Sequence, residues 1–570
     1  MKVYAYVVSA LILVILASYA SGLMALNAYE SWINYSNPYS AVLEGLRYED
    51  VGSFRPIADS LVFVLIDGAA VDTLLDLRRS SGDVDRLLSM GAFYINGLSA
   101  LPSYSLTTRA SILTGAPSEI HGVSSNEYRD LLKIDSIVRI AWERGYTILC
   151  SGDESFATFF RNYLREHVSI EDGAGHGAVS LMAGLDILRR YSASGASGKV
   201  FLWIGVADVD LTGHAVGGPA GAEYRAAIVN NARLVMEFVE SLRREGLLDK
   251  TLLVVLNDHG FKRGGHHGGL EPEVRKVFAL FIGPSVKPGL YEAPFTQYDI
   301  APTISMLMGW KIPIASIGRP LSEGFDVSGE RVTTYVEASR AQGLNLIKAI
   351  AEEAGAELKG PRTPLEAYDQ LVELKLREGM QARALYALAI ATPVISVAIL
   401  TLRRVKPSIK RPDVIALVMG VVAFEAFYWL SYMFLKGPWS LSEIISFYDV
   451  LAKIGISTTA GGLALGLTIG VIELTPYRSG LKRALVRTFA ALLMATALGL
   501  LYSLPFYVTY GPIVRFPFPN WDAALFYFVT LMRVASVGST ALLPLVVVNV
   551  ALALTGAYLH RRLQVRKHVA

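Results

Sequence analysis

The sequence has a single cysteine, Cys150, among 570 residues, and charged residues make up only 18% of it. One cysteine cannot form a disulfide within the chain or supply a cysteine-based zinc site, so any metal must be held by other side chains. We expect Cys150 itself to be a small buried side chain at the end of a strand. Apolar residues reach 52%, and this composition indicates a membrane protein with more than one region.

Basic residues are scarce outside three clusters in the second half of the chain. Of the 53 lysines and arginines, 13 lie in these clusters, which leaves 40 against 50 acidic residues. The net negative charge of the chain outside these clusters argues against a nucleic-acid-binding surface. The clusters are Arg403, Arg404, Lys406, Lys410 and Arg411; Arg478, Lys482, Arg483 and Arg487; and Arg561, Arg562, Arg566 and Lys567.

No charged residue occurs from Val3 to Tyr29, a stretch long enough to span a bilayer. The segment Ser18-Tyr-Ala20 could be a signal-peptidase site, but the apolar run is long for a cleaved signal. We therefore expect an uncleaved anchor over residues 1–29, and in either case an exported chain after it.

The other long apolar segments lie at the end of the chain, at 384–402, 413–435, 455–474, 485–508 and 536–559. The basic clusters follow the first, third and fifth of them, whereas the loops around Lys436 and Arg515 are nearly free of basic residues. The positive-inside rule then predicts a multi-pass protein of the cell membrane with both termini cytoplasmic and the large domain outside. The expected division is an anchor (1–29), an extracytoplasmic catalytic domain (30–360), a linker helix (361–383) and a five-span region (384–570).

The five-span region contains a weak internal repeat. Each half has a span, a Gly-Pro loop, and a stretch beginning Phe-Tyr, at Phe447-Tyr448 and Phe526-Tyr527. With Trp439, Trp521, Lys453 and Arg533, these stretches predict amphipathic helices at the outer interface. The repeat could hold a lipid or simply form two anchoring hairpins. Glu425, inside the span 413–435, marks either a functional site or a structural ion pair.

Acidic and histidine side chains follow three short apolar runs that are typical of buried parallel strands. In open α/β sheets, ligands bind outside the carboxyl ends of such strands. Carboxylates and imidazoles there suit two divalent metal ions, zinc or else manganese. The residues are Asp67 after the run 61–66, Asp210 and His214 after 200–206, and Asp258, His259 and His267 after 251–256.

Ser105 begins a predicted helix that ends near Thr114-Gly115. A hydroxyl at a helix N-terminus is most often a cap, but the helix dipole and free N–H groups there also favour an anion. If a metal coordinates its Oγ, Ser105 becomes a nucleophile. We expect His121 and His176 to be structural loop histidines.

These residues resemble the alkaline phosphatase superfamily. The similarity covers roughly 60–310 and is nearest to the nucleotide pyrophosphatase/phosphodiesterase branch and to the glycosylphosphatidylinositol (GPI) ethanolamine phosphate transferases. The motifs that carry it are the strand-end Asp67, the Pro-Ser-x-Ser nucleophile segment, Asp-x-x-Gly-His at 210–214, Asp-His-Gly at 258–260, and Gly-x-His-Gly at 265–268. The resemblance implies an α/β fold with an alkaline phosphatase-like, mostly parallel central sheet and helices on both faces, beside an all-α transmembrane region.

The resemblance also implies a ligand set and a mechanism. One metal is held by Asp210, His214 and His267, the last preferred over His266 from the Gly-x-His-Gly spacing. The other metal is held by Asp67, Asp258 and His259 and contacts Ser105. Ser105 attacks phosphorus in line, and water or an acceptor hydroxyl then attacks the phospho-enzyme.

The nucleophile segment departs from the family pattern. Thr107 stands where the family usually has proline, and Thr108 where phosphodiesterases usually have asparagine. Arg109 resembles the sulfatase motif, but the ligand set differs from the sulfatase calcium site. As candidate catalytic residues we name Ser105, Thr108 and Arg109; Arg109 either holds a phosphate oxygen or forms an ion pair on the helix.

Two functions fit these residues best. The first is a membrane-anchored phosphodiesterase or phosphohydrolase acting on a phosphate ester. The alternative is a phosphoethanolamine-type transferase directed at a lipid or glycan. A sulfatase fits less well, because the ligand set differs from the sulfatase calcium site. A non-catalytic transport or assembly protein also fits less well, because loss of catalysis would normally cost at least one ligand.

Overall fold

The computed structural model describes residues 2–193, 198–405, 411–444, 446–474, 481–511 and 520–541, with single residues up to Tyr558. The chain divides into two compact units. We call Trp32–Lys375 the sheet unit, and Met1–Ser31 together with Leu376–Ala570 the helical unit.

The sheet unit is built on one sheet, which has nine strands in its described residues, in the order β4-β3-β5-β1-β6-β7-β2-β8 with β9 beside β2. Strands β4, β3, β5, β1 and β6 run parallel, and β7 is antiparallel to both of its neighbours, β6 and β2. The bounds are β1 Ser60–Ile66, β2 Ala92–Leu98, β3 Thr147–Ser151, β4 Leu164–Val168, β5 Val200–Val206, β6 Thr251–Leu256, β7 Lys276–Ile282, β8 Gly289–Tyr291 and β9 Phe295–Thr296.

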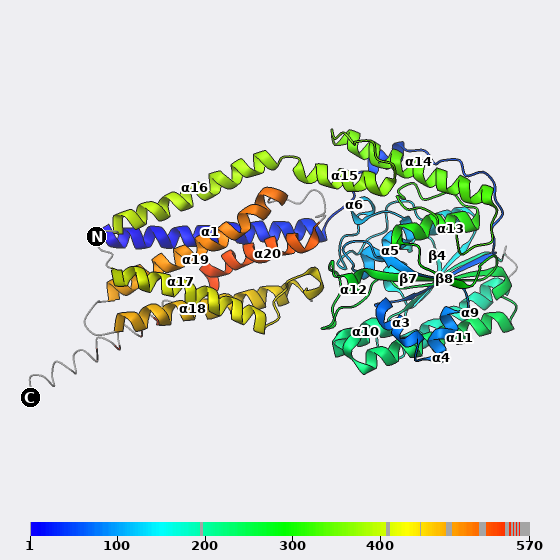
Figure 1. The fold of residues 1–570 in the computed structure, drawn as a ribbon, viewed down its shortest axis with the longest axis horizontal. Helices are drawn as coiled ribbons and strands as arrows, with labels where there is room; N and C mark the ends of the chain where they lie inside the picture. Colours follow the sequence, from blue (N-terminus) through cyan, green and yellow to red (C-terminus); the bar gives the residue numbers. More distant parts are fainter. Residues whose placement is uncertain are drawn as a thin grey trace, which may run out of the picture. The chain divides into compact units, whose positions relative to one another are not determined.

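Helices cover both faces of this sheet (Figure 1). Helices α3, α4, α9 and α11 pack with the strands in one apolar core, and α5, α13 and α14 lie on the opposite face. Every residue of β1, β5 and β6 is buried, as expected for parallel strands covered on two sides. The predicted mostly parallel sheet with helices on both faces is therefore confirmed.

The helices of the sheet unit have the following bounds: α2 Ser40–Gly45, α3 Val71–Arg78, α4 Gly82–Leu88, α5 Ser105–Thr114, α6 Ser118–His121, α7 Ile137–Glu143, α8 Glu154–Phe160, α9 His176–Ala193, α10 Asp208–Val216, α11 Ala222–Arg244, α12 Pro272–Arg275, α13 Ile300–Met308, α14 Gly329–Glu353 and α15 Pro364–Arg377.

The strand register brings four carboxyl ends to one edge of the sheet. Ile66 at the end of β1 pairs with Val206 at the end of β5, and Leu65 pairs with Leu256 at the end of β6. Strand β3 joins the same edge, since Ser151 pairs with Ile204 of β5. Residues just beyond these strands therefore meet, although they lie far apart in sequence.

The helical unit contains α1 Lys2–Ile33, α16 Met380–Val405, α17 Arg411–Phe434, α18 Phe447–Leu474, α19 Leu481–Tyr510 and α20 Trp521–Ser536, followed by a π-helical turn Val537–Ala541. Among the described residues, five helices are long and apolar enough to cross a membrane: Leu11–Ile33, Val414–Phe434, Phe447–Ile472, Val486–Tyr510 and Trp521–Ala541. The chain is a multi-pass membrane protein. The predicted span 384–402 lies within α16. Of the predicted span 536–559, residues 536–541 belong to the candidate span Trp521–Ala541, and most of the rest lies outside the described residues. The third basic cluster also lies outside them.

The structure corrects the two expected interfacial helices. Phe447-Tyr448 begins α18, one continuous helix that includes the predicted span 455–474, and Phe526-Tyr527 lies within a helix long enough to span by itself. The polar residues in these segments are paired within the helical unit, which lowers the cost of placing them in apolar surroundings. Lys453 Nζ lies 2.7 Å from an Asp449 carboxylate oxygen.

Arg533, expected at the interface, is buried and forms an ion pair with Glu425. Its guanidinium carbon also lies 4.3 Å from the ring centroid of Tyr428, within range of a cation–π interaction. Of the two interpretations of Glu425, the structure thus supports a structural ion pair.

Candidate metal centre

The structure brings all seven predicted ligands together at the carboxyl edge of the sheet. Two groups of three side chains offer ligand atoms within 4.8 Å of one another: Asp210, His259 and His267, and Asp67, Asp258 and His259. His214 joins the first group, with its Nε2 3.4 Å from Asp210 Oδ2. Ser105 joins at His259, with its Oγ 3.2 Å from Nε2. We call the first group, with His214, the Asp210 cluster, and the second the Asp67 cluster.

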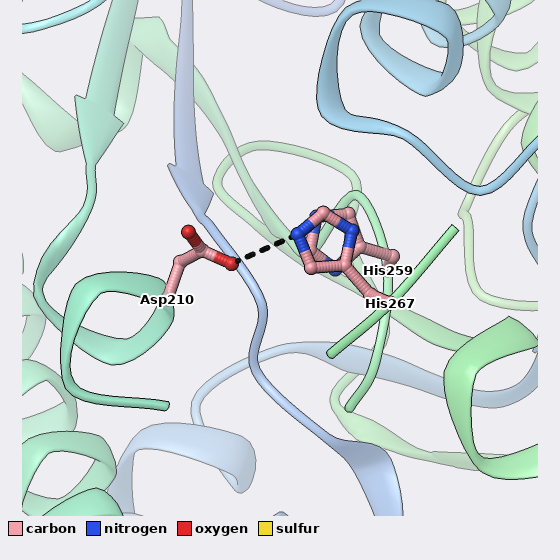
Figure 2. Close-up of side chains that lie close together, drawn as sticks. All are labelled: Asp210, His259 and His267. Atoms are coloured by element: carbon pink, nitrogen blue, oxygen red, sulfur yellow. Dashed lines mark ion pairs between the residues drawn. The ribbon is translucent and has the colours of Figure 1, made fainter. Parts of the chain in front are cut away.

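Figure 2 shows how Asp210 faces the two imidazoles of its cluster. Asp210 Oδ1 lies 3.5 Å from His267 Nε2, and the rings of His259 and His267 stack with their centroids 3.6 Å apart. Since His259 belongs to both groups, it lies between the two clusters.

Backbone carbonyls orient the three imidazoles. Nδ1 of His214 lies 2.8 Å from Gly265 O, that of His259 3.1 Å from Gly260 O, and that of His267 3.3 Å from Ser103 O. A carbonyl oxygen can only accept, so each Nδ1 donates and Nε2 faces the carboxylates. Metal-binding histidines in proteins almost always have such a partner on the other ring nitrogen.

The turn after β1 positions two of the carboxylates. Gly68 has a φ of 68° and donates its N–H to Asp258 Oδ1 at 3.1 Å. A Cβ at this position would lie 2.5 Å from the Phe261 ring and 2.9 Å from Asp210 Oδ1. Glycine is therefore required for the strand end to approach both clusters.

Burial and mutual repulsion perturb the acidic groups. Burial would raise the pKa of Asp67, but attraction to Arg109 and then to His259 holds it well below its usual range. Burial, followed by repulsion from Asp67, raises the pKa of Asp210 well above its usual range and that of Asp258 to about 6. Carboxylates crowded in this way favour a bound cation, which would stabilise their charged forms.

Burial lowers the pKa of His259, but Asp258 and then Asp67 outweigh that effect and raise it to about 9. Because a histidine must be neutral to coordinate a metal, a cation bound at Nε2 would displace this proton.

The donor set fits two divalent metal ions. Asp67 Oδ1 and Asp210 Oδ1 are buried and make no hydrogen bond within the described structure, and such orphaned oxygens are costly unless a cation or water completes them. Nitrogen and carboxylate oxygen ligands without sulfur suit zinc, and manganese as a harder alternative.

Ser105 is the first residue of α5, where N–H groups have no carbonyl partner within the helix. Next to it, the exposed side chain of Asn126 accepts a hydrogen bond from Leu106 N at 3.1 Å. Asn126 therefore lies beside the N-terminus of the helix that carries Ser105. The sequence analysis missed Asn126, because nothing local distinguishes it from any loop asparagine.

Thr108 and Arg109 are buried and bonded to other groups of the protein. The Thr108 hydroxyl donates to Tyr104 O at 2.9 Å and Ser105 O at 3.0 Å and is fully buried. Arg109 is also buried and pairs with Asp67, Asp153 and Asp258.

Asp153 is a second residue that the sequence analysis missed. It lies two positions beyond β3, and the signal was present, since an apolar run ending in Gly152-Asp153 repeats the pattern of the other strand ends.

His121 and His176 lie outside the clusters: His121 Nε2 bonds Ser111 Oγ at 3.0 Å, and His176 Nδ1 lies 3.3 Å from Ser180 Oγ.

The chain is distantly homologous to the GPI ethanolamine phosphate transferases, which confirms the resemblance drawn from its motifs. It is 25% identical over 247 residues to GPI ethanolamine phosphate transferase 3 of Eremothecium gossypii, covering 39% of this chain and 23% of that protein. It is 22% identical to GPI ethanolamine phosphate transferase 2 of Candida albicans, covering 55% of this chain and 38% of that protein. The match thus spans well under half the length of these curated relatives. No family model matches the chain.

Among solved structures, the chain is similar to wild-type alkaline phosphatase PafA at 13% identity and a TM-score of 0.40, covering 48% of this chain and 100% of that one. It is also similar to murine ectonucleotide pyrophosphatase/phosphodiesterase 5 at 11% identity and a TM-score of 0.37, covering 47% of this chain and 97% of that one.

Proposed function

We propose that this chain is a membrane phosphotransferase that uses Ser105 and two divalent metal ions to move a phosphoethanolamine-type group from a lipid donor to a lipid or glycan acceptor. The observation that carries the proposal is the position of the Ser105 hydroxyl, 3.2 Å from the histidine that both metal clusters share. The names of its curated relatives favour transfer over hydrolysis, so we place the phosphodiesterase or phosphohydrolase interpretation second.

In the proposed reaction, Ser105 Oγ attacks the phosphorus of the donor in line, and the bond from phosphorus to the donor's alcohol oxygen breaks. An acceptor hydroxyl then attacks the phosphoserine and releases Ser105. The metals, when bound, would promote loss of the Ser105 proton and offset charge on the phosphoryl oxygens. Asp210, His214 and His267 would hold one, and Asp67, Asp258 and His259 the other.

The chain's own groups contribute orientation. The N-terminus of α5 would favour the negative charge of a phosphoryl group bound at Ser105, and the Asn126 amide can add a donor. Backbone carbonyls keep Nε2 of each histidine directed at the carboxylates.

Hydrolysis is the second candidate because the Asp210 cluster is open to solvent. The His214 side chain is 43% exposed, so water can reach the site and replace the acceptor hydroxyl. The same chemistry then yields a phosphohydrolase, and only the acceptor distinguishes the two functions.

We further propose that the sheet unit is extracytoplasmic and that both termini are cytoplasmic, as the distribution of basic residues predicts. The division into an anchor (1–29), a catalytic domain (30–360), a linker helix (361–383) and a five-span region (384–570) belongs to the same proposal.

The test uses the full-length protein in liposomes that contain an aminophospholipid with a labelled headgroup. After chelation, zinc or manganese is added back, and labelled lipid or glycan products are separated from free phosphoethanolamine. Transfer that requires metal and an acceptor supports the proposal. Metal-dependent release of free phosphoethanolamine alone would favour the hydrolase, and absence of both would refute a phosphoryl-transfer function.

A further inference from the structure

Both Nη groups of the Arg109 guanidinium are bonded to carboxylates and a hydroxyl beside the candidate metal centre. Its Nη1 donates to Asp153 Oδ1 at 3.2 Å and to Ser155 Oγ at 2.8 Å. Its Nη2 donates to Asp67 Oδ2 and, at 3.4 Å, to Asp258 Oδ2. All four Nη hydrogens therefore have partners, whereas Nε is buried without a hydrogen-bond partner among the described residues. A substrate phosphate would have to displace these bonds to reach Arg109.

This arrangement raises an electrostatic difficulty. Arg109 is a permanent cation that contacts Asp67 and Asp258, two of the three members of the Asp67 cluster. An unbalanced cation there would neutralise the two carboxylates and repel a divalent metal, and burial strengthens this repulsion because the local dielectric is low.

Asp153 supplies the balancing charge. Its Oδ1 accepts from Arg109 and from the backbone N–H groups of Ser155 and Phe156, both at 3.0 Å, as the N-cap of α8. A carboxylate that accepts several N–H bonds at a helix N-terminus is stabilised in its charged form.

Trp203 of β5 fixes the other Asp153 oxygen. Its indole Nε1 donates to Asp153 Oδ2 at 2.7 Å, and its ring stacks on Phe156 with centroids 5.1 Å apart. Gly205, on the same face of β5, leaves room for this approach, because a Cβ there would lie 2.8 Å from the Asp153 Cβ. Asp153 is thus held from both sides.

We propose that Asp153, held by Trp203, is a positioning residue that balances the charge of Arg109, so that Arg109 can draw Asp67 and Asp258 together without expelling a metal from their cluster. The residue touches neither substrate nor metal ligand directly. This inference rests on the metal centre of the proposed function, and its main readout is metal affinity rather than transfer.

The experiment titrates zinc into chelator-stripped full-length protein in detergent, against a chromophoric competitor. Asp153→Asn should lower the zinc affinity of the Asp67 cluster by at least about 10-fold, as for other residues that support metal ligands. The zinc affinity of the Asp210 cluster should change by less than about 3-fold. The titration is repeated in a His214→Ala background, in which the Asp210 cluster binds zinc weakly, and this shows which cluster Asp153→Asn affects. Added zinc should restore the turnover number of Asp153→Asn, with KM changed less than about 3-fold.

Two further variants separate charge balance from a general folding defect. Trp203→Phe keeps the Asp153 carboxylate and an aromatic ring in the same place, and should lower the zinc affinity of the Asp67 cluster by a smaller factor. If Asp153→Asn fails to fold, the inference is tested with Trp203→Phe instead. Adding Arg109→Gln to Asp153→Asn removes the unbalanced cation and should recover at least about 3-fold of the lost affinity.

Matched controls are Asp135→Asn and Trp310→Phe, which change a buried carboxylate and a buried indole of the same unit away from the clusters. The inference would be overturned if Asp153→Asn lowered the zinc affinity of both clusters equally or of neither. It would also be overturned if the double variant with Arg109→Gln bound zinc no more tightly than Asp153→Asn alone. If the unmodified protein binds no zinc or manganese, the metal centre of the proposed function itself fails, which is a distinct result.

Discussion

The hydroxyl of Ser105 and Nε2 of His259 lie 3.2 Å apart, although 154 residues separate them in sequence. Ser105 comes from the N-terminus of α5 and His259 from the end of β6. Their contact joins the candidate nucleophile to the imidazole shared by both clusters. The candidate site therefore depends on how a helix from one face of the sheet meets the strand ends.

Replacing Ser105 by alanine should lower the transfer rate at least about 100-fold, comparable to the loss of other principal catalytic groups. The metal content should stay near that of the unmodified protein, because carboxylates and imidazoles provide most ligands. Rates and bound zinc are measured on the same preparation. Ser111→Ala is the control, since Ser111 lies on the same helix but bonds His121. Full activity of Ser105→Ala would exclude Ser105 as the nucleophile.

Two histidines near the site should respond differently to removal. His214→Ala should lower the zinc affinity of the Asp210 cluster by about 10- to 100-fold or more, because it removes an imidazole directed at Asp210. His266→Ala should change metal affinity little, since His267 is the neighbour that faces Asp210. Competition titrations with zinc check both. Comparable weakening in the two variants would mean that the assignment of His267 over His266 is incorrect.

Gly68→Ala should disrupt both the fold and the metal centre. A positive φ costs a non-glycine residue about 1–2 kcal/mol, and overlap with the Phe261 ring adds about 1–3 kcal/mol. Gly246→Ala is the matched control, because Gly246 has a similar φ of 66° but open space around its would-be Cβ. Urea unfolding of the full chain in detergent, followed by pulse proteolysis, compares the two. Equal losses of stability would show that the contact with Phe261 is unimportant.

The stability of the sheet unit should depend on pH through Glu119. Burial raises the pKa of Glu119 to about 7, against about 4.3 in an unfolded chain. Between these values the folded state binds one more proton than the unfolded state. Its contribution is therefore complete below about pH 4 and is lost as pH rises toward 7, by at most about 1.4 kcal/mol per pH unit.

Glu119→Gln should remove this slope, so that the variant gains stability over the unmodified protein as pH rises from 4.5 to 7.5. The same unfolding experiment at several pH values measures the difference, with Glu127→Gln as an exposed control. Parallel stability curves for Glu119→Gln and the unmodified protein would contradict the raised pKa.

The sequence analysis found the side chains that meet at the candidate metal centre because their signal is local. Each of Asp67, Asp210 and Asp258 follows an apolar run that forms a buried strand, and parallel strands place such residues at one edge. Asp153 followed the same rule but was overlooked, since β3 is shorter and its neighbouring sequence matched no motif. The role of Arg109 stayed open because a cation's partners lie on other segments.

The prediction of two interfacial helices was wrong for a related reason. Arg533 and Lys453 suggested segments at the membrane surface, because a charge in an apolar stretch is costly unless it is paired. Arg533 is 108 residues from its partner Glu425, and no periodicity within either helix reveals that pairing.

By itself, the order of amino acids determined which segments become buried strands or apolar helices and which reactive side chains follow them, because those properties depend on neighbours a few positions away. Only the tertiary structure decided the strand order, the partners of Arg109 and Arg533, and the shared position of His259. These depend on contacts between distant segments, where packing and charge balance of the whole fold select the partner.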